Sequence, residues 1–170
     1  VVVSVVVNAA QTESVLFGDD GQSGAASTMR PGSTFVMCST VDPNWSVALE
    51  TRLEGMGLQY VDAPISGGAA KAASGQMTMM TAGKPAAYAV AEPFLNAMAA
   101  KVYKLGDSAG AGSKAKTINQ HLAGVHIAVA AEAMALGAAG DTARGAARSV
   151  TLEPCAPRSE RGPDCAGLVA

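Results

Sequence analysis

Apolar runs alternate along the chain with short polar or glycine-containing segments, and their lengths separate strands from helices. The first run, Val1 to Val7, is apolar apart from Ser4, a composition typical of a strand buried on both faces of a parallel sheet. This alternation predicts an α/β fold with a mostly parallel sheet and right-handed crossovers. Further strands are expected over residues 34–38, 58–61, 76–82 and 101–105, and helices over residues 9–17, 43–54 and 86–99.

Residues at the ends of these segments predict where two helices begin and end. Asp42 and Pro43 are a typical N-cap and first helical residue, and Gly18 ends the preceding helix. Asn8 follows the first strand, at the edge where open α/β sheets bind ligands, so it is a candidate ligand contact. We favour the other interpretation, in which Asn8 is the N-cap of the helix over residues 9–17.

The longest helix is expected from Ser113 to about Ala139, a stretch without proline that follows two closely spaced glycines, Gly110 and Gly112. Apolar residues recur within it at three- and four-residue steps, which predicts a stripe buried along one side. The stripe consists of Ile118, Leu122, Val125, Val129, Ala133 and Leu136.

Candidate chemistry lies in the first turns of this helix. Lys116, Asn119 and Gln120 are spaced i, i+3 and i+4, so an amine and two carboxamides share one side. This group suits an oxygen-rich small molecule with which the amine could exchange a proton. The alternative is an exposed lysine on an ordinary helix. The glycines also fit the dinucleotide fingerprint with Glu132 as its acidic residue, but Glu132 lies inside the helical pattern, so we reject that interpretation.

A second candidate site follows the strand over residues 58–61. In Ser66-Gly67-Gly68, two glycines let backbone N–H groups approach an anion, and the serine adds a hydroxyl, an arrangement that suits a carboxylate. We expect Asp62 to brace this turn and not to take part in chemistry. His126 is expected to be packed or solvated, with a site-lining role as the alternative.

Composition narrows the class of protein. The 170 residues suit one domain or a piece of a larger protein, and 49% hydrophobic with only 4% aromatic content indicates close-packed α/β structure. A formal charge of −2 gives no electrostatic reason to bind nucleic acid or an anionic membrane. Three cysteines form neither a disulfide framework nor a metal-ligand pattern, which favours a reducing, cytoplasmic compartment.

The two ends of the chain carry expectations of their own. The first apolar run has no initiator Met and no basic region, so we expect a fragment that opens inside a strand, with no signal peptide or membrane anchor. After Gly140 no sustained period remains and three prolines follow. Residues 141–170 are therefore expected to be a poorly ordered tail.

Taken together, three segments resemble the 3-hydroxyisobutyrate (β-hydroxyacid) dehydrogenase family. They are Asp62-Ala63-Pro64-Ile65-Ser66-Gly67-Gly68, then Gly75 with Met77-Thr78-Met79-Met80, and Gly110-x-Gly112-x-x-x-Lys116-x-x-Asn119. Four further segments most resemble its L-threonate dehydrogenase branch, namely Val7-Asn8-Ala9-Ala10-Gln11, Val15-Leu16-Phe17-Gly18, Lys71-Ala72-Ala73 and Leu122-Ala123-Gly124-Val125-His126-Ile127-Ala128. The resemblance extends over about residues 1 to 140. It implies an oxidoreductase that removes hydride from the hydroxyl of a short 3-hydroxy acid, with NAD or NADP as cofactor.

The resemblance also implies roles for individual residues. Lys116 would be the catalytic acid/base, Ser66, Gly67 and Gly68 would bind the substrate carboxylate, and Asn119 would be a further substrate ligand. Val6, Val7, Gln11 and Thr40 would contact the cofactor. The sequence departs from the family pattern in two places. Val6-Val7 stands where the family usually has a Leu-Pro pair, and Gln120 stands where it usually has a second Asn after the lysine.

In domain organisation, the resemblance implies a partial Rossmann-like fold. Residues 1–108 would be the C-terminal part of an NAD(P)-binding domain, residues 109–140 a long inter-domain helix, and residues 141–170 a disordered or aberrant tail. We expect this chain alone to bind dinucleotide weakly or not at all and not to turn over, and the full-length protein to be a homo-oligomer. The alternatives are a non-catalytic binding or scaffold module derived from the family, and an unrelated α/β domain whose serine-glycine turn binds another anion.

Overall fold

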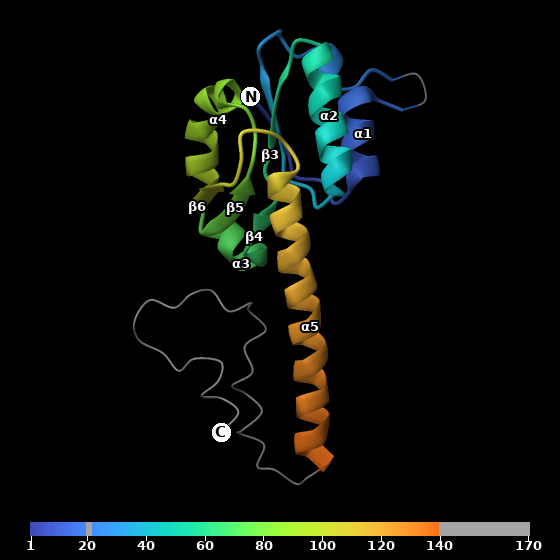
Figure 1. The fold of residues 1–170 in the computed structure, drawn as a ribbon, viewed down its shortest axis with the longest axis vertical. Coiled ribbons are helices and arrows are strands. Elements are labelled where there is room, and N and C mark those ends of the chain that lie inside the picture. The colour runs from blue at the N-terminus through green and yellow to red at the C-terminus, as the bar shows by residue number, and fades with distance from the viewer. Residues whose placement is uncertain (20–21, 140–170) are drawn as a thin grey trace. The chain divides into compact units, whose positions relative to one another are not determined.

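A computed structural model describes residues 1–19 and 22–139 (Figure 1), so the tail predicted over residues 141–170 lies outside the described residues. The chain forms two compact units, Val1–Thr117 and a second that begins at Ile118. The strands are β1 (Val2–Ser4), β2 (Thr34–Met37), β3 (Gln59–Asp62), β4 (Ile65–Ser66), β5 (Met77–Thr81) and β6 (Ala99–Lys104). The helices are α1 (Ala9–Phe17), the 3₁₀ turn η1 (Ala25–Ser27), α2 (Pro43–Gly55), α3 (Gly68–Ala73), α4 (Pro85–Met98) and α5 (Ala111–Ala139).

The strands form two three-stranded sheets that meet at the end of β3. One sheet has the order β1-β2-β3 and is parallel, with Met37 opposite Asp62. In the other, β4 is antiparallel and β6 parallel to β5. Asp62 and Ala82 exchange two backbone hydrogen bonds of 2.9 and 2.8 Å, which join the sheets. The prediction of an α/β fold with a mostly parallel sheet is confirmed, and the two-residue strand β4 adds its antiparallel part.

Helices cover both faces of the first sheet (Figure 1). Alternate residues of β2 point to opposite faces. Phe35 and Met37 pack with apolar residues of α1 and α2 in one cluster, whereas Val36 packs with residues of α4 in another. All four residues of β2 are buried, so the sheet core lies between α1 and α2 on one side and α4 on the other.

The predicted helix ends follow local capping chemistry. Asn8 accepts a hydrogen bond from the backbone N–H of Gln11, which confirms its interpretation as the N-cap of α1. Asp42 accepts from the N–H groups of Asn44 and Trp45 at the start of α2. Gly18 ends α1 with φ of 83°, a left-handed conformation that favours glycine.

The first apolar run is less buried than its composition predicts. The strand is limited to Val2–Ser4, and Val5 and Val7 are 64% and 75% exposed. Burial of the whole run on both faces is therefore a wrong prediction. The reason is that β1 lies at the end of the strand order, and the residues after Ser4 extend beyond its pairing with β2.

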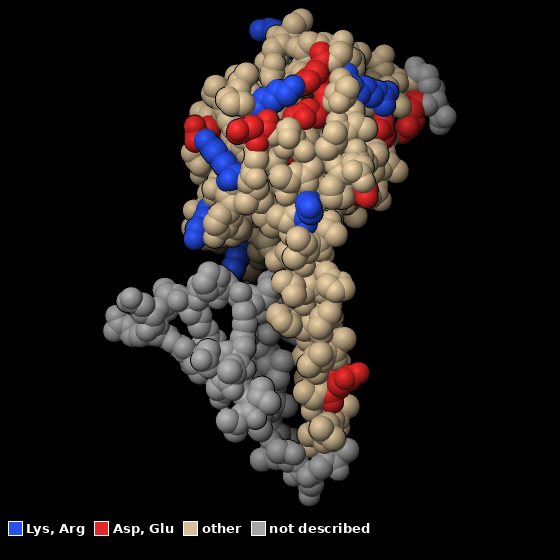
Figure 2. All heavy atoms as spheres, viewed as in Figure 1, with Lys and Arg blue, Asp and Glu red and all other residues tan. Residues whose placement is uncertain are grey.

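The apolar stripe of α5 has the predicted helical period, but its residues are not buried. Ile118, Leu122, Val125, Val129 and Leu136 are each 46 to 76% exposed, so the prediction that they are buried is wrong for this chain. Figure 2 shows few charged side chains along this helix, in contrast to the mixed charges over the strands and the other helices. None of the described helices is long and apolar enough to cross a membrane.

Candidate active site

The carboxyl ends of β1, β2 and β3 lie next to one another. The Ser39 hydroxyl donates to the carbonyl oxygen of Val6 at 2.7 Å, which ties the segment after β2 to the segment after β1. The backbone N–H of Ala63 donates to the carbonyl oxygen of Met37 at 2.8 Å, which ties the segment after β3 to β2. Residues that follow these three strands therefore share one edge of the sheet, where open α/β sheets bind ligands.

Four candidate cofactor residues lie at this edge. Val6 is half-buried, and Val7, Gln11 and Thr40 are exposed. The N–H of Val7 donates to Gln11 Oε1 at 2.8 Å, so that side chain shapes the turn before α1 and leaves its amide nitrogen as a donor. This open edge, lined by a hydroxyl, an amide and backbone groups, is chemically suited to a dinucleotide.

Asp62 ends β3 and is fully buried. Its Oδ2 accepts hydrogen bonds from the N–H groups of Gly110 (2.9 Å) and Ser113 (2.8 Å), and its Oδ1 accepts from the Ser113 hydroxyl (2.7 Å). Burial raises the pKa of Asp62, while the hydrogen bonds from Ser113 and Gly110 oppose the rise. Asp62 is thus a structural residue, as expected, but what it braces is the start of α5.

The two glycines before Lys116 allow α5 to start close to the sheet. Gly110 has φ of 95°, which favours glycine. A Cβ on Gly112 would lie 2.6 Å from the carbonyl oxygen of Met80 and 2.8 Å from that of Asp62. Their function is close backbone packing, in agreement with our rejection of the dinucleotide fingerprint.

Lys116 lies one turn beyond Gly112, so both residues belong to the same side of α5. The lysine is only 7% exposed and makes no hydrogen bond or ion pair with any other residue in the described part of the chain. Burial lowers its pKa from the ordinary value, because removal from water disfavours the charged amine. A lysine whose pKa is lowered in this way has a larger neutral fraction at a given pH than an exposed lysine, which favours proton transfer.

The serine-glycine turn has the conformation that its sequence predicts. Gly67 and Gly68 have φ of 135° and 66°, both in the region that favours glycine. Ser66 is half-buried, and its hydroxyl has no hydrogen-bond partner among residues 1–19 and 22–139. Ser66 pairs with Thr78 of β5, the strand whose Met80 lies against Gly112, so the turn and the start of α5 share one neighbouring strand.

The remaining candidates lie in the second unit, which begins at Ile118. Asn119 is half-buried and Gln120 is exposed. His126 is half-buried, whereas His121 is exposed. Of the predicted substrate residues, the first unit thus contains Lys116 and the serine-glycine turn but not Asn119.

Two residues of this region were assigned no role from the sequence. Ser113 supplies two of the three hydrogen bonds to Asp62, and the signal that could have found it is the glycine before α5, which has no side chain to cap the helix. Lys71 of α3 packs against Gly67. A Cβ added to Gly67 would lie 2.8 Å from the Cβ of Lys71. The six-residue helix that carries Lys71 was not predicted.

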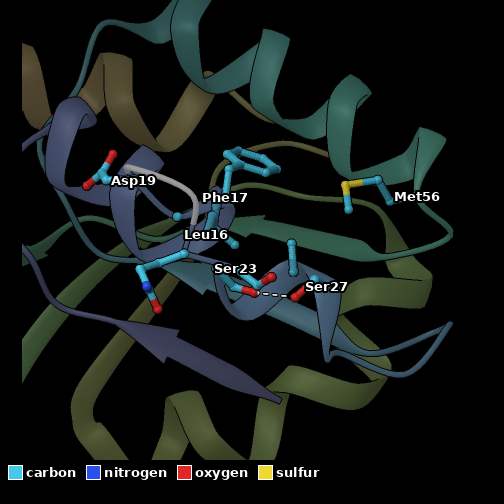
Figure 3. A pocket seen from close by; sticks show the side chains of 10 residues that line it. Leu16, Phe17, Asp19, Ser23, Ser27 and Met56 are labelled. Carbon is cyan, nitrogen blue, oxygen red and sulfur yellow. Dashed lines mark hydrogen bonds between the residues drawn. The ribbon is translucent and has the colours of Figure 1, made fainter.

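The two hollows described on the first unit lie away from these residues. One, of about 400 Å³, is lined by Leu16, Phe17 and Met56 together with the loop after α1 (Figure 3). The other, of about 560 Å³, lies between α4 and the end of β6 and includes Tyr88 and Lys104. Among the described residues, no group of three or more His, Cys, Asp or Glu side chains is placed to hold a metal ion.

Comparison with known proteins gives a consistent family. Residues 1–106 match the NAD binding domain of 6-phosphogluconate dehydrogenase. L-threonate dehydrogenase of Cupriavidus necator is 60% identical over 137 residues, 81% of this chain and 45% of that protein. The chain thus spans less than half the length of this relative.

Solved structures agree with the sequence comparison. The crystal structure of 3-hydroxyisobutyrate dehydrogenase from Salmonella typhimurium is 48% identical, with a TM-score of 0.76 over 81% of this chain and 47% of that chain. The corresponding Mycobacterium tuberculosis enzyme, in a structure with L-serine, is 32% identical, with a TM-score of 0.60 over 70% of this chain and 40% of that one. The chain therefore belongs to the 3-hydroxyisobutyrate dehydrogenase family, as the motifs predict, and residues 1–106 match an NAD-binding domain.

Proposed function

We propose that this chain is part of an NAD(P)-dependent oxidoreductase that oxidises the hydroxyl of a short 3-hydroxy acid similar to L-threonate. The observation that carries the proposal is the buried Lys116 side chain, whose amine has no partner in the described residues and which extends from the side of α5 that faces β3 and β5. The substrate class is supported by the L-threonate dehydrogenases of Cupriavidus necator and Escherichia coli K12, which are 60% and 48% identical.

In this proposal Lys116 is the general base. Oxidation of a secondary alcohol releases the hydroxyl proton, and a neutral amine within hydrogen-bond reach can accept it. An ordinary lysine, with a pKa of about 10.4, is almost fully protonated at pH 7. Burial lowers the pKa of Lys116 and so increases the neutral fraction that can accept the proton. In the reverse direction the protonated amine returns the proton to the alcohol oxygen.

The carboxylate of the acid would bind at the serine-glycine turn. The Ser66 hydroxyl and the backbone N–H groups of Gly67 and Gly68 are the proposed donors, and the positive φ of both glycines supports this use. Asn119 is the proposed ligand for a substrate hydroxyl, since its carboxamide can both donate and accept.

NAD or NADP, when bound, supplies the acceptor for the hydride that leaves the alcohol carbon. Val6, Val7, Gln11 and Thr40 are proposed to hold it at the shared edge of β1 and β2. The hydrogen bond of 3.1 Å between the hydroxyls of Thr12 and Ser39 would keep the two segments in register. Residues 1–108 are proposed as part of the cofactor domain and residues 109–140 as the inter-domain helix.

A chimera tests the proposal directly. The 137-residue segment matched in the Cupriavidus necator enzyme would be replaced by the matching segment of this chain, and NAD reduction by L-threonate measured at 340 nm. We expect turnover, and we expect Lys116→Met to lower kcat by about 10²-fold or more while cofactor affinity stays within threefold. Lys114→Met, at an exposed neighbour, is the control and should retain activity.

Two results would contradict the proposal: a folded chimera that binds NAD without oxidising L-threonate or related 3-hydroxy acids, or a Lys116→Met chimera within tenfold of its parent. The second candidate function is a non-catalytic binding module derived from the family. Calorimetric titration of the 170-residue chain with NAD and NADP separates the two. We expect weak binding or none, and micromolar affinity would overturn this expectation.

A further inference from the structure

We propose that Asp62 is a positioning residue that fixes the first turn of α5 on the sheet and thereby sets where the Lys116 amine lies. The catalytic meaning of this role rests on the proposed function, whereas the structural coupling between the two residues does not. The coupling is carried by hydrogen bonds, close backbone packing and the burial of the lysine.

Asp62 supplies a helix cap that the local sequence lacks. A helix leaves its first N–H groups without intrahelical partners, and the side chain of the N-cap residue usually accepts one of them. The residue before α5 is Gly110, which has no side chain. The Asp62 carboxylate, 48 and 51 positions away in sequence, accepts instead from the N–H groups of Gly110 and Ser113 and from the Ser113 hydroxyl. Its negative charge also suits the positive end of the helix dipole.

The carboxylate is itself held in place from both sides. Asp62 pairs with Met37 in the parallel sheet and exchanges two backbone hydrogen bonds with Ala82. Its side chain is fully buried, so the aspartate cannot follow a movement of the helix. The absence of a Cβ on Gly112 then lets the first turn come into contact with the carbonyl oxygens of Asp62 and Met80.

Lys116 follows Ser113 by three positions and Gly112 by four. It therefore lies one turn beyond the first turn of α5, which Asp62 holds, and on the same side of the helix. Burial is the cause of its lowered pKa, and that burial depends on α5 staying against the sheet. Release of the first turn would admit water to the amine and return its pKa toward the ordinary value.

A second buried carboxylate supports the same segment. Glu50 of α2 is 7% exposed, and its Oε2 accepts a hydrogen bond from the N–H of Ala109 at 3.2 Å. Three N–H groups at the start of α5, those of Ala109, Gly110 and Ser113, thus point to two carboxylates from different elements. This arrangement fixes the position of the helix start as well as its direction.

The test is a titration of the Lys116 amine in the 170-residue chain, followed by ¹³Cε NMR, with a short unstructured lysine peptide as the reference. In the unmodified chain we expect the Lys116 amine to titrate below the peptide amine, because burial lowers its pKa. In Asp62→Ala, which removes the acceptor of all three hydrogen bonds, we expect the Lys116 midpoint to rise toward the peptide value. Amide hydrogen exchange over residues 110–116 should accelerate together with this rise.

Two further variants make the test specific. Ser113→Ala removes one of the three hydrogen bonds and leaves the aspartate in place, so it should raise the midpoint by a smaller amount. This variant keeps the test available if Asp62→Ala does not fold. Asp42→Ala is the matched control, because Asp42 caps α2 by the same chemistry, with Asn44 and Trp45 as donors. This control should lose stability and leave the Lys116 midpoint unchanged.

The positioning role is overturned if folded Asp62→Ala and Ser113→Ala both leave the Lys116 midpoint unchanged within the error of the titration. It is also overturned if Asp42→Ala moves the midpoint as far as Asp62→Ala does, because the effect would then report general stability. Either outcome would leave the lysine chemistry standing. Conversely, an active Lys116→Met chimera would remove the proposed function and leave this coupling intact.

Discussion

The hydroxyl of Ser113 donates to Asp62 Oδ1 over 2.7 Å, although 51 positions separate the two residues in the chain. This contact, with the two N–H groups bound by Oδ2, joins the end of β3 to the start of α5. The serine and the aspartate are both buried, so water cannot replace the contact if it is lost.

Truncation of the aspartate should therefore be costly. We expect Asp62→Ala to lower the free energy of unfolding by about 2–4 kcal/mol, because buried donors lose a charged acceptor. Asp42→Ala, which removes an exposed cap, should cost about 1 kcal/mol. Chemical denaturation of the two variants measures the difference, and equal losses would contradict the importance of burial at Asp62.

Substitution by alanine should change the stability of the protein in opposite directions at two glycines of α5. Gly112→Ala places a Cβ 2.6 Å from the carbonyl oxygen of Met80, so we expect a loss of about 1–3 kcal/mol. Gly124→Ala meets no atom within 4 Å and should raise stability by about 1 kcal/mol, since alanine favours the helix. Thermal unfolding of both variants checks the signs; a neutral Gly112→Ala would mean that the helix start is free to move.

Glu50 predicts a pH dependence of stability. Burial raises the pKa of its carboxyl, so the folded state holds this proton more tightly than the unfolded state does. The contribution of Glu50 is then fully present below its unfolded pKa and is lost as the pH rises through the folded value. Glu50→Gln, which cannot ionise, should gain stability relative to the parent chain as the pH increases from 4 to 8. A difference in Tm that stays constant over this range would show that Glu50 titrates as in water.

Cys38 should be inert in the folded protein. Burial raises the pKa of its thiol to about 12, and the thiolate is the reactive form. We expect iodoacetamide at pH 8 to leave Cys38 unmodified in the native chain and to alkylate it in urea, as read by peptide mass spectrometry. Rapid native labelling at this position would show that β2 opens locally.

The parts of the fold that could be predicted are those determined by residues close together in the sequence. The starts of α1 and α2 follow from Asn8 and Asp42, whose side chains cap N–H groups two or three positions away, and both were predicted. Strand β4 was missed because two residues carry no period, and only the pairing of Ile65 with Met79 and of Ser66 with Thr78 defines it. Burial of the first apolar run was overpredicted, since composition does not say which strand lies at an edge.

The same distinction applies to the candidate site. The bracing role of Asp62 could be predicted from a carboxylate beside a turn, but its partner in α5 could not, because no local pattern connects positions 62 and 113. Burial of Lys116 depends on the close approach that Gly112 permits, which is a tertiary property. The roles of Ser66, Asn119 and the cofactor residues stay predictions for the experiments above.

The long sequence separation between β3 and the start of α5 also bears on the order of folding. Closing a loop of this length costs chain entropy before the contact can stabilise anything. The acceptor, moreover, is in place only after β2 and β3 have paired. We therefore expect docking of the first turn of α5 to be a late event in folding, so that a chain arrested before it would have a paired sheet while the lysine side chain is still hydrated.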